Sequence, residues 1–183
     1  MEEAQEIVAE ANDEKLTITE KNTENIEEVN TTTLDVAKST VMKTEETTEE
    51  TSIANINGVK IASVPVTGVI SSRYGSVSSL RVSTHTGLDI AAPYGTAIKA
   101  VADGTVTFAA YSGSYGYLVK IDHGNGVETW YGHTSKMYVK AGEKVNAGDT
   151  IAAVGSTGNS TGNHLHLEIR INGKHVNPQK YLY

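Results

Sequence analysis

Residues His164-Leu-His-Leu-Glu-Ile-Arg-Ile171 alternate strictly between polar and apolar side chains. A period of two is typical of a β-strand, in which successive side chains point to opposite faces. One face would carry His164, His166, Glu168 and Arg170, and the other would carry only leucine and isoleucine. We therefore predict a strand that buries its apolar face and presents two imidazoles on the opposite face.

The rest of the C-terminal region consists of short apolar segments separated by Gly, Asn and Asp, without helix-length periodicity. Seven further strands are predicted at Gly68–Ser71, Gly87–Ile90, Ala97–Val101, Gly104–Ala110, Tyr117–Asp122, Val127–Thr134 and Thr150–Val154. A weak repeat relates Gly95–Gly104 to Gly142–Gly155. We therefore expect an all-β fold, a compact β-sandwich of two similar hairpin-rich halves.

The first third of the chain has a different composition. All 17 Gly lie from Gly58 onward, and residues 1–52 hold 15 Asp and Glu against 4 Lys and Arg. The net charge is −11 for residues 1–52 and +4 for residues 53–183. A segment so acidic and so poor in apolar residues cannot offset its ordering entropy by burial. We predict a disordered, Thr-rich tail or linker over residues 1–55 and a folded domain over residues 56–183; a tail that docks on the basic domain is the alternative to a solvated spacer.

Composition also excludes several function classes. The chain has no cysteine, so disulfides, thiolate catalysis and Cys-based metal sites are excluded, and a transition metal would need His and carboxylate ligands. No apolar run is long enough to span a membrane, and no secretory signal is visible. Lys and Arg are scattered rather than clustered with aromatic residues, which argues against nucleic acid as a partner.

The segment His85-Thr-Gly-Leu-Asp89 places an imidazole and a carboxylate four residues apart. In an extended strand residues i and i+4 share a face, and Gly87 between them disfavours a helix. Zinc takes nitrogen and carboxylate oxygen ligands, and both groups are available deprotonated at neutral pH. Together with one histidine of the 164/166 pair they make three ligands, the number typical of a catalytic zinc with an open position for water.

Spacing alone does not decide which of His164 and His166 would be the ligand, since two imidazoles about 7 Å apart along a strand face can share a site without binding the same ion. The other member of the pair and His133 are then candidates for proton transfer and oxyanion stabilisation. The His85–Asp89 segment and the His164–Ile171 segment, each taken alone, also fit a strand with surface histidines. For Glu168 and Arg170 we expect a surface ion pair, and the alternative is that Asn163, Glu168 and Arg170 orient the imidazoles.

The motifs His85-xxx-Asp89, Trp130-Tyr-Gly-His133 and His164-Leu-His166, in this order, resemble the lysostaphin-type (LytM-like) zinc endopeptidases of peptidoglycan. The resemblance covers residues 64–183 and includes the supporting stretches Ile70–Gly75, Ala91–Thr96, Val139–Gly148 and Asn172–Pro178. Carried over position by position, it implies that His85, Asp89 and His166 hold one zinc ion. It also implies that His133 and His164 are the catalytic pair.

The same resemblance implies an antiparallel β fold with an open groove, walled here by Tyr74–Thr84, Tyr111–Tyr117 and Ser156–Asn163. Four tyrosines in or next to these walls suit the binding of an extended peptide, and they suit equally well the covering of a sheet edge. They are Tyr74, Tyr111, Tyr115 and Tyr117.

The function implied is that of a zinc metalloendopeptidase that hydrolyses peptide crosslinks or stem peptides of bacterial peptidoglycan. We expect a monomeric catalytic domain that works outside the cytoplasm, secreted or associated with the cell wall. One alternative is an inactive wall-binding or amidase-activating module of the same fold. Another is a lipoyl- or biotinyl-type carrier domain, suggested by the hairpin at Val145–Asp149, but such a domain has no use for His85, Asp89 and His166.

Overall fold

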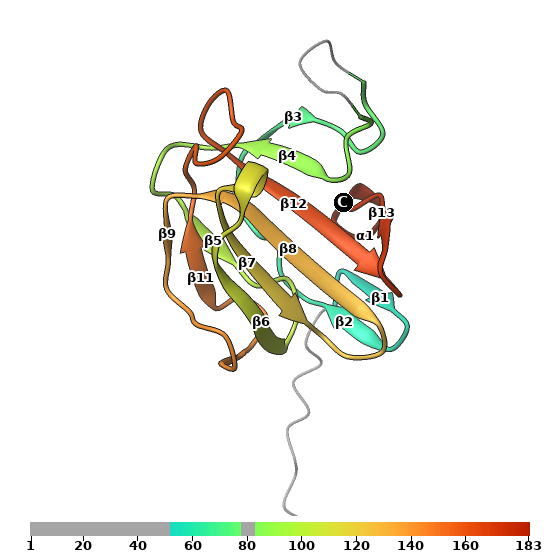
Figure 1. Cartoon of the computed structure of the whole chain (residues 1–183). Helices are drawn as coiled ribbons and strands as arrows, with labels where there is room; N and C mark the ends of the chain where they lie inside the picture. The colour runs from blue at the N-terminus through green and yellow to red at the C-terminus, as the bar shows by residue number, and fades with distance from the viewer. Residues whose placement is uncertain (1–51, 78–82) are drawn as a thin grey trace, which may run out of the picture. The chain divides into compact units, whose positions relative to one another are not determined.

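The large β-sheet is built around two eight-residue strands, β8 (Val127–Thr134) and β12 (His164–Ile171), which lie side by side. The computed structural model describes residues 52–77 and 83–183. The sheet has the order β10-β6-β7-β8-β12-β4-β3, β13 also pairs with β12, and these pairs are antiparallel (Figure 1). Its other strands are β3 (Val69–Ser72), β4 (Leu88–Ala91), β6 (Gly104–Tyr111), β7 (Tyr117–Asp122), β10 (Lys144–Val145) and β13 (Lys174–Val176).

A second sheet has the order β5-β11-β9, formed by β5 (Ala97–Lys99), β11 (Thr150–Ala153) and β9 (Lys136–Met137). The two segments of the weak repeat meet here, because β5 and β11 pair antiparallel with Ala97 opposite Ala153. The predicted all-β, antiparallel architecture is confirmed. The predicted division into two similar halves is seen only as the pairing of the two repeat segments, β5 with β11. The two sheets themselves differ, with eight and three strands.

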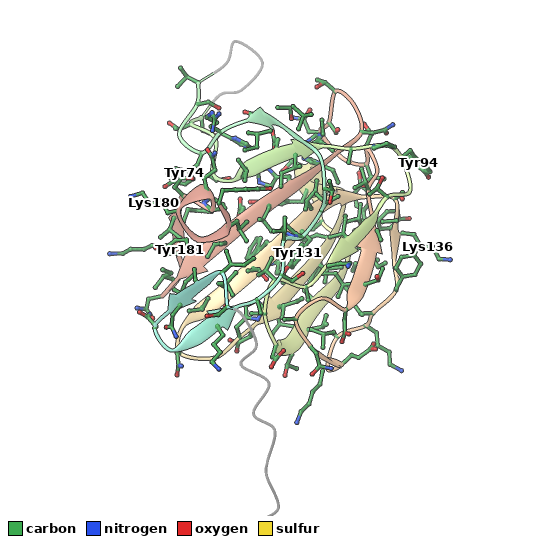
Figure 2. The ribbon with its side chains drawn as sticks, turned by 180° about the vertical axis from the view of Figure 1, so that it is seen from behind. Tyr74, Tyr94, Tyr131, Lys136, Lys180 and Tyr181 are labelled. Carbon is green, nitrogen blue, oxygen red and sulfur yellow. The ribbon has the colours of Figure 1, made fainter. Side chains whose placement is uncertain are left out.

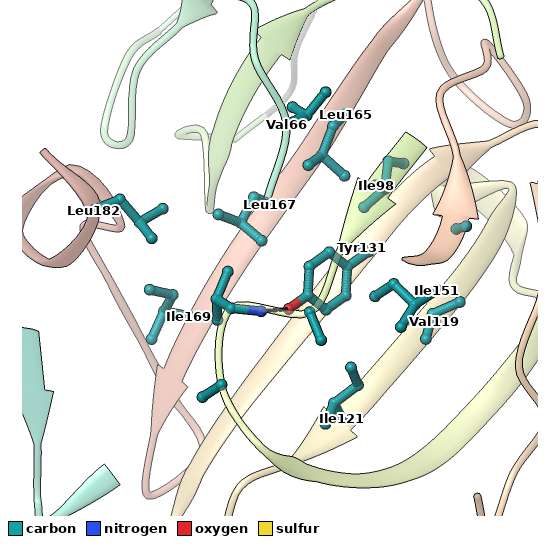
Figure 3. Packing of buried hydrophobic residues seen from close by; sticks show 14 of the residues in the cluster. Val66, Ile98, Val119, Ile121, Tyr131, Ile151, Leu165, Leu167, Ile169 and Leu182 are labelled. Carbon is teal, nitrogen blue, oxygen red and sulfur yellow. Dashed lines mark hydrogen bonds between the residues drawn. The ribbon is translucent and has the colours of Figure 1, made fainter. Parts of the chain in front are cut away.

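The apolar face of β12 forms the centre of the core. Leu165, Leu167 and Ile169 are fully buried and pack in one cluster with Ile98 of β5 and Ile151 of β11, so the core joins the two sheets (Figure 3). The predicted separation of faces on β12 is thereby confirmed. It results from the period of two, which sends every second side chain to the core.

Tyr131 is the largest side chain in this core and is completely buried on β8. Its hydroxyl oxygen accepts hydrogen bonds from the backbone N–H of Val101 (3.1 Å) and from the hydroxyl of Thr129 (3.0 Å), and Figure 3 shows the first of these contacts. A buried hydroxyl without partners would cost free energy, so these bonds allow a phenol to occupy an apolar interior.

All eight predicted strands are present, and three of them have the predicted bounds. The structure adds β9, β10 and β13 and a hairpin of β1 (Ala54–Ile56) and β2 (Val59–Ile61). This hairpin turns at Asn57-Gly58, both with positive φ, a pair typical of tight hairpin turns that the sequence analysis overlooked. Strand β1 begins two residues before the predicted domain start at residue 56.

Two short helical segments were also not predicted, the 3₁₀ turn η1 (Gly113–Tyr115) and α1 (Gln179–Leu182). Neither of these, nor any other helix in the described part of the chain, has the length and apolar character needed to cross a membrane. Residues 1–51 of the predicted acidic tail lie outside the described residues. The predicted boundary between tail and domain, at residues 55 and 56, stays a prediction.

We predict that Tyr131→Phe lowers the free energy of unfolding by about 1–3 kcal/mol, because it leaves the buried Val101 N–H without its acceptor and removes the contact with the Thr129 hydroxyl. Urea denaturation followed by circular dichroism measures this. The matched control is Tyr94→Phe, since Tyr94 is 69% exposed and lies at the periphery (Figure 2). An equal effect of the two substitutions would contradict the role given to the buried hydroxyl.

Candidate active site

Pairing of three strands brings the candidate site residues together. On β12, His166 stands opposite Asp89 of β4 and opposite Gly132 of β8. His85 lies just before β4, and His133 follows Gly132 on β8. Residues 81 positions apart in the sequence are thus neighbours because the antiparallel ladders fix their register.

Three ligating atoms converge between these strands. Asp89 Oδ1 lies 2.7 Å from His166 Nδ1 and 3.0 Å from His85 Nε2, and the two nitrogens are 3.1 Å apart. All three side chains are buried. Within the described residues this is the one group of histidines and carboxylates whose ligand atoms are close enough to hold a metal ion.

Hydrogen bonds on the far side of each imidazole fix which nitrogen carries hydrogen. Nδ1 of His85 lies 2.9 Å from the carbonyl oxygen of Arg73, and Nε2 of His166 lies 3.2 Å from the carboxylate of Glu168. Since carbonyl and carboxylate oxygens only accept, each of these nitrogens is a donor. When the two rings are neutral, the lone pairs of His85 Nε2 and His166 Nδ1 therefore face the Asp89 oxygen.

This donor set fits a metal ion. Two nitrogen lone pairs and a carboxylate oxygen repel one another at about 3 Å unless a cation or a proton lies among them. A tetrahedral zinc ion with ligands at about 2.0–2.1 Å separates its donor atoms by roughly 3.3 Å, close to the observed spacing. We conclude that His85, Asp89 and His166 can hold a metal ion.

The carboxylates on either side of His166 are ionised. Burial by itself raises the pKa of Asp89, but its contacts with the imidazoles of His166 and His85 outweigh burial and hold that pKa far below its usual range. Burial by itself lowers the pKa of His166, but its hydrogen bonds to Asp89 and Glu168 raise it on balance. A proton therefore competes with a metal ion for this position, and metal binding weakens as the pH falls.

The other two histidines lie next to the candidate metal ligands, and their rings are 4.7 Å apart. Nδ1 of His133 donates to the carbonyl oxygen of Thr157 (2.8 Å), and Nδ1 of His164 donates to that of Gly162 (2.8 Å). Nδ1 is thus the donor in both rings, and Nε2 is the nitrogen left to exchange a proton. In His164 this atom lies 3.8 Å from Asp89 Oδ1, on the side of the candidate metal ligands.

His133 combines two features typical of functional residues. Its φ of 60° lies in the left-handed region, which is rare for residues other than glycine and tends to occur at active sites. Burial lowers its pKa to about 4, so the ring is neutral at pH 7. A neutral imidazole with a free Nε2 can act as a base.

Gly87 allows the close approach of His85 and Asp89 to β12. A Cβ atom on Gly87 would lie 2.4 Å from the carbonyl oxygen of Leu167 and 2.8 Å from the ring of His166. No other residue fits there without displacing a candidate ligand. The sequence analysis used this glycine only to argue against a helix.

All five candidate residues line a cavity of about 820 Å³. The three predicted wall segments all contribute to it, through Ser76, Val77, Ser83 and Thr84 from the first, Ser114 and Tyr115 from the second, and Asn159, Ser160 and Thr161 from the third. Of the four tyrosines considered, Tyr115 is the one that lines the cavity. The hydroxyl of Tyr74 instead donates to the carbonyl oxygen of His175, and Tyr111 packs edge to face against Tyr117.

The expected surface ion pair of Glu168 and Arg170 is wrong in one respect. The two residues are paired, with 2.7 Å between Arg170 Nη2 and Glu168 Oε2, but Glu168 is completely buried and also contacts His166. Sequence alternation put the carboxylate on the polar face. It could not reveal that Tyr115 and Thr86 cover that face at this point.

A family model described as Peptidase family M23 matches residues 83–178. The DD-carboxypeptidase/endopeptidase Mpg of Neisseria meningitidis is 55% identical over 94 residues, which are 51% of this chain and 22% of that protein. The murein hydrolase activator EnvC of Escherichia coli is 40% identical over 118 residues, 64% of this chain and 28% of that protein. The chain therefore spans less than a third of the length of these curated relatives.

Solved structures are similar as well. A zinc-containing peptidase from Vibrio cholerae has a TM-score of 0.59 and 32% identity, over 62% of this chain and 37% of that one. The catalytic domain of the antimicrobial peptidase lysostaphin from Staphylococcus simulans has a TM-score of 0.58 and 32% identity, over 61% of this chain and 90% of that one. The second match covers nearly the whole of a catalytic domain.

We predict that Gly87→Ala destabilises the fold by about 1–3 kcal/mol and sharply weakens metal binding, because the added methyl group meets Leu167 and His166. Thermal unfolding and a zinc titration measure the two effects. Gly162→Ala is the matched control, since nothing lies within 4 Å of its added Cβ. Unchanged zinc binding by Gly87→Ala would show that the tight approach is not needed.

We predict that the metal-free protein loses stability as the pH falls from about 6.5 to about 4. Burial lowers the pKa of His133 to about 4. Between these pH values His133 therefore binds a proton in the unfolded chain but not in the folded chain. The loss attributable to His133 is on the order of a few kcal/mol. Urea denaturation at several pH values should show a shallower dependence for His133→Gln, and parallel curves would contradict the assignment.

Proposed function

Because the chain belongs to peptidase family M23, whose model matches residues 83–178, we propose that it is a zinc metalloendopeptidase acting on bacterial peptidoglycan. In this proposal His85, Asp89 and His166 hold one zinc ion, and His133 and His164 are the catalytic pair. The observation that carries it is the convergence of three ligand atoms beside two histidines whose Nδ1 atoms donate to backbone carbonyls, inside one cavity.

The chemistry assigned to each group follows from its contacts. When bound, zinc polarises the scissile carbonyl and makes a water molecule more acidic. One histidine of the catalytic pair would accept a proton from the attacking water through Nε2 and pass it to the amine that leaves when the peptide bond breaks. The other, carrying a proton taken from solvent at Nε2, would donate a hydrogen bond to the scissile carbonyl oxygen as negative charge develops there. The carbonyl oxygens of Thr157 and Gly162 hold the two rings in place through their Nδ1 atoms.

Peptide bonds of peptidoglycan are the proposed substrate for two reasons. Relatives of this chain include a DD-carboxypeptidase/endopeptidase and proteins named peptidoglycan DD-endopeptidase. Three loop segments rich in Ser, Thr and Asn line the cavity, and their hydroxyl and amide groups suit hydrogen bonds to a peptide backbone. Since peptidoglycan lies outside the cytoplasmic membrane, we place the protein there, acting as a monomeric catalytic domain preceded by an acidic tail.

A second candidate is an activator or wall-binding module without hydrolytic activity, and the similarity to EnvC favours it. Our preference for an enzyme rests on the presence of all five side chains around one cavity. Zinc bound at one equivalent, with no turnover of any crosslinked wall preparation, would favour the second candidate.

We predict that the protein releases peptide-bond cleavage products from purified peptidoglycan. Activity should disappear with a chelator, return with zinc, and fall about 10²–10⁴-fold in His164→Ala, which removes one of the two proton-transfer groups. Mass spectrometry of the soluble products measures cleavage and identifies the bond. The control variant is His123→Gln, because His123 does not line the cavity. Cleavage that persists in chelator or in His164→Ala would rule out the mechanism.

A further inference from the structure

We propose that Glu168 is a positioning residue that sets the orientation and the hydrogen-bonded tautomer of His166, and that Tyr115 and Arg170 hold Glu168 in place for this task. The inference rests on the proposed zinc site. It concerns a buried carboxylate that has no part in the ligand set or in the catalytic pair.

Both oxygens of Glu168 are occupied by donors. Oε1 accepts from the hydroxyl of Thr86 (2.6 Å), the hydroxyl of Tyr115 (2.9 Å) and Nε2 of His166 (3.2 Å). Oε2 accepts from Nε and Nη2 of Arg170 at 2.9 and 2.7 Å. Because burying a carboxylate is costly, a fully buried Glu persists only where donors compensate it, and here they compensate it at both oxygens.

His166 differs from the other three imidazoles of the site in how it is held. His85, His133 and His164 each donate through Nδ1 to a neutral backbone carbonyl. His166 donates through Nε2 to an ionised carboxylate, and it consequently presents Nδ1 to Asp89. A carboxylate acceptor fixes the ring and also strengthens the ligand as an electron donor, which carbonyl acceptors do to a smaller degree.

Arg170 is itself held in a fixed position. Its guanidinium lies 3.3 Å from the ring centroid of Trp130, and Nζ of Lys120 lies 3.6 Å from the same ring. The planar guanidinium can therefore stack on the indole while it donates two hydrogen bonds to Glu168. Lysine at position 170 would keep the charge and lose this double contact.

Tyr115 connects the carboxylate to the wall of the cavity. It lies at the end of η1, lines the cavity, and packs against both Trp130 and His166 with ring centroids 5.7 and 5.8 Å away. Its hydroxyl shares Oε1 of Glu168 with His166. The groove wall is thereby joined to a metal ligand through one buried oxygen.

The test compares Glu168→Gln, Tyr115→Phe and the control Tyr138→Phe in the full chain. Zinc affinity is measured by competition with a chromophoric chelator, and the cobalt-substituted protein reports ligand geometry through its visible spectrum. Glutamine cannot accept from all the donors that face Glu168, so we expect zinc affinity to fall 10- to 100-fold together with a changed cobalt spectrum. Tyr115→Phe should weaken affinity about threefold to tenfold, the effect of one hydrogen bond. Tyr138 is 50% exposed and does not line the cavity, so its variant should match the wild type.

The inference is overturned if Glu168→Gln lowers the melting temperature of the metal-free protein while zinc affinity and the cobalt spectrum stay as in the wild type, because Glu168 would then be purely structural. If Glu168→Gln does not fold, Tyr115→Phe decides by the same two measurements. A wild type that binds no zinc would overturn the proposed function and this inference together. A wild type that binds zinc and cleaves peptidoglycan, with unaltered variants, would overturn this inference alone.

Discussion

Strand β12 lies between β4 and β8, and the hydrogen bonds on its two sides set His166 opposite Asp89 and opposite Gly132 at once. A slip of one residue on either side would turn the imidazoles into the core and the leucines out of it. The buried leucines and isoleucine on the core face oppose such a slip, because exposing each of them would cost about 1.5–3 kcal/mol. The apolar core and the polar site are therefore held by the same register.

The candidate site concentrates charge on buried side chains. Asp89 and Glu168 are both buried and ionised, and His166 lies between them. Hydrogen bonds from His166, Thr86 and Arg170 outweigh the burial of Glu168 and lower its pKa to about 2. Such an arrangement is stable only when positive charge is available, from Arg170, from a proton on His166 or from a metal ion. A cation at the position where the three ligand atoms meet would therefore be electrostatically favoured.

Backbone carbonyls orient three of the four histidines by accepting hydrogen bonds from their Nδ1 atoms. Loops supply the acceptors for His85, His133 and His164, and each loop is also a wall of the cavity or adjoins it. Loop conformation and imidazole orientation are consequently linked. This arrangement explains why a site built mainly on strands still depends on segments such as Ser156–Asn163, which have no regular structure.

The sequence by itself determined the all-β fold and the strands that carry the candidate site, because alternation with a period of two is a local property of the chain. The spacing of His85 and Asp89 indicated a shared face, and the division of the five candidate residues into ligands and a catalytic pair rested on the resemblance to a known family. It did not reveal the β1–β2 hairpin, whose Asn57-Gly58 signal was present but overlooked, or the burial of Glu168 beneath Tyr115 and Thr86. Only the tertiary structure decided which nitrogen of each imidazole is free and that the lone pairs of His85 and His166 face Asp89. Those properties depend on contacts between residues distant in sequence, and a pattern of neighbouring residues carries no information about which distant oxygen accepts from which ring.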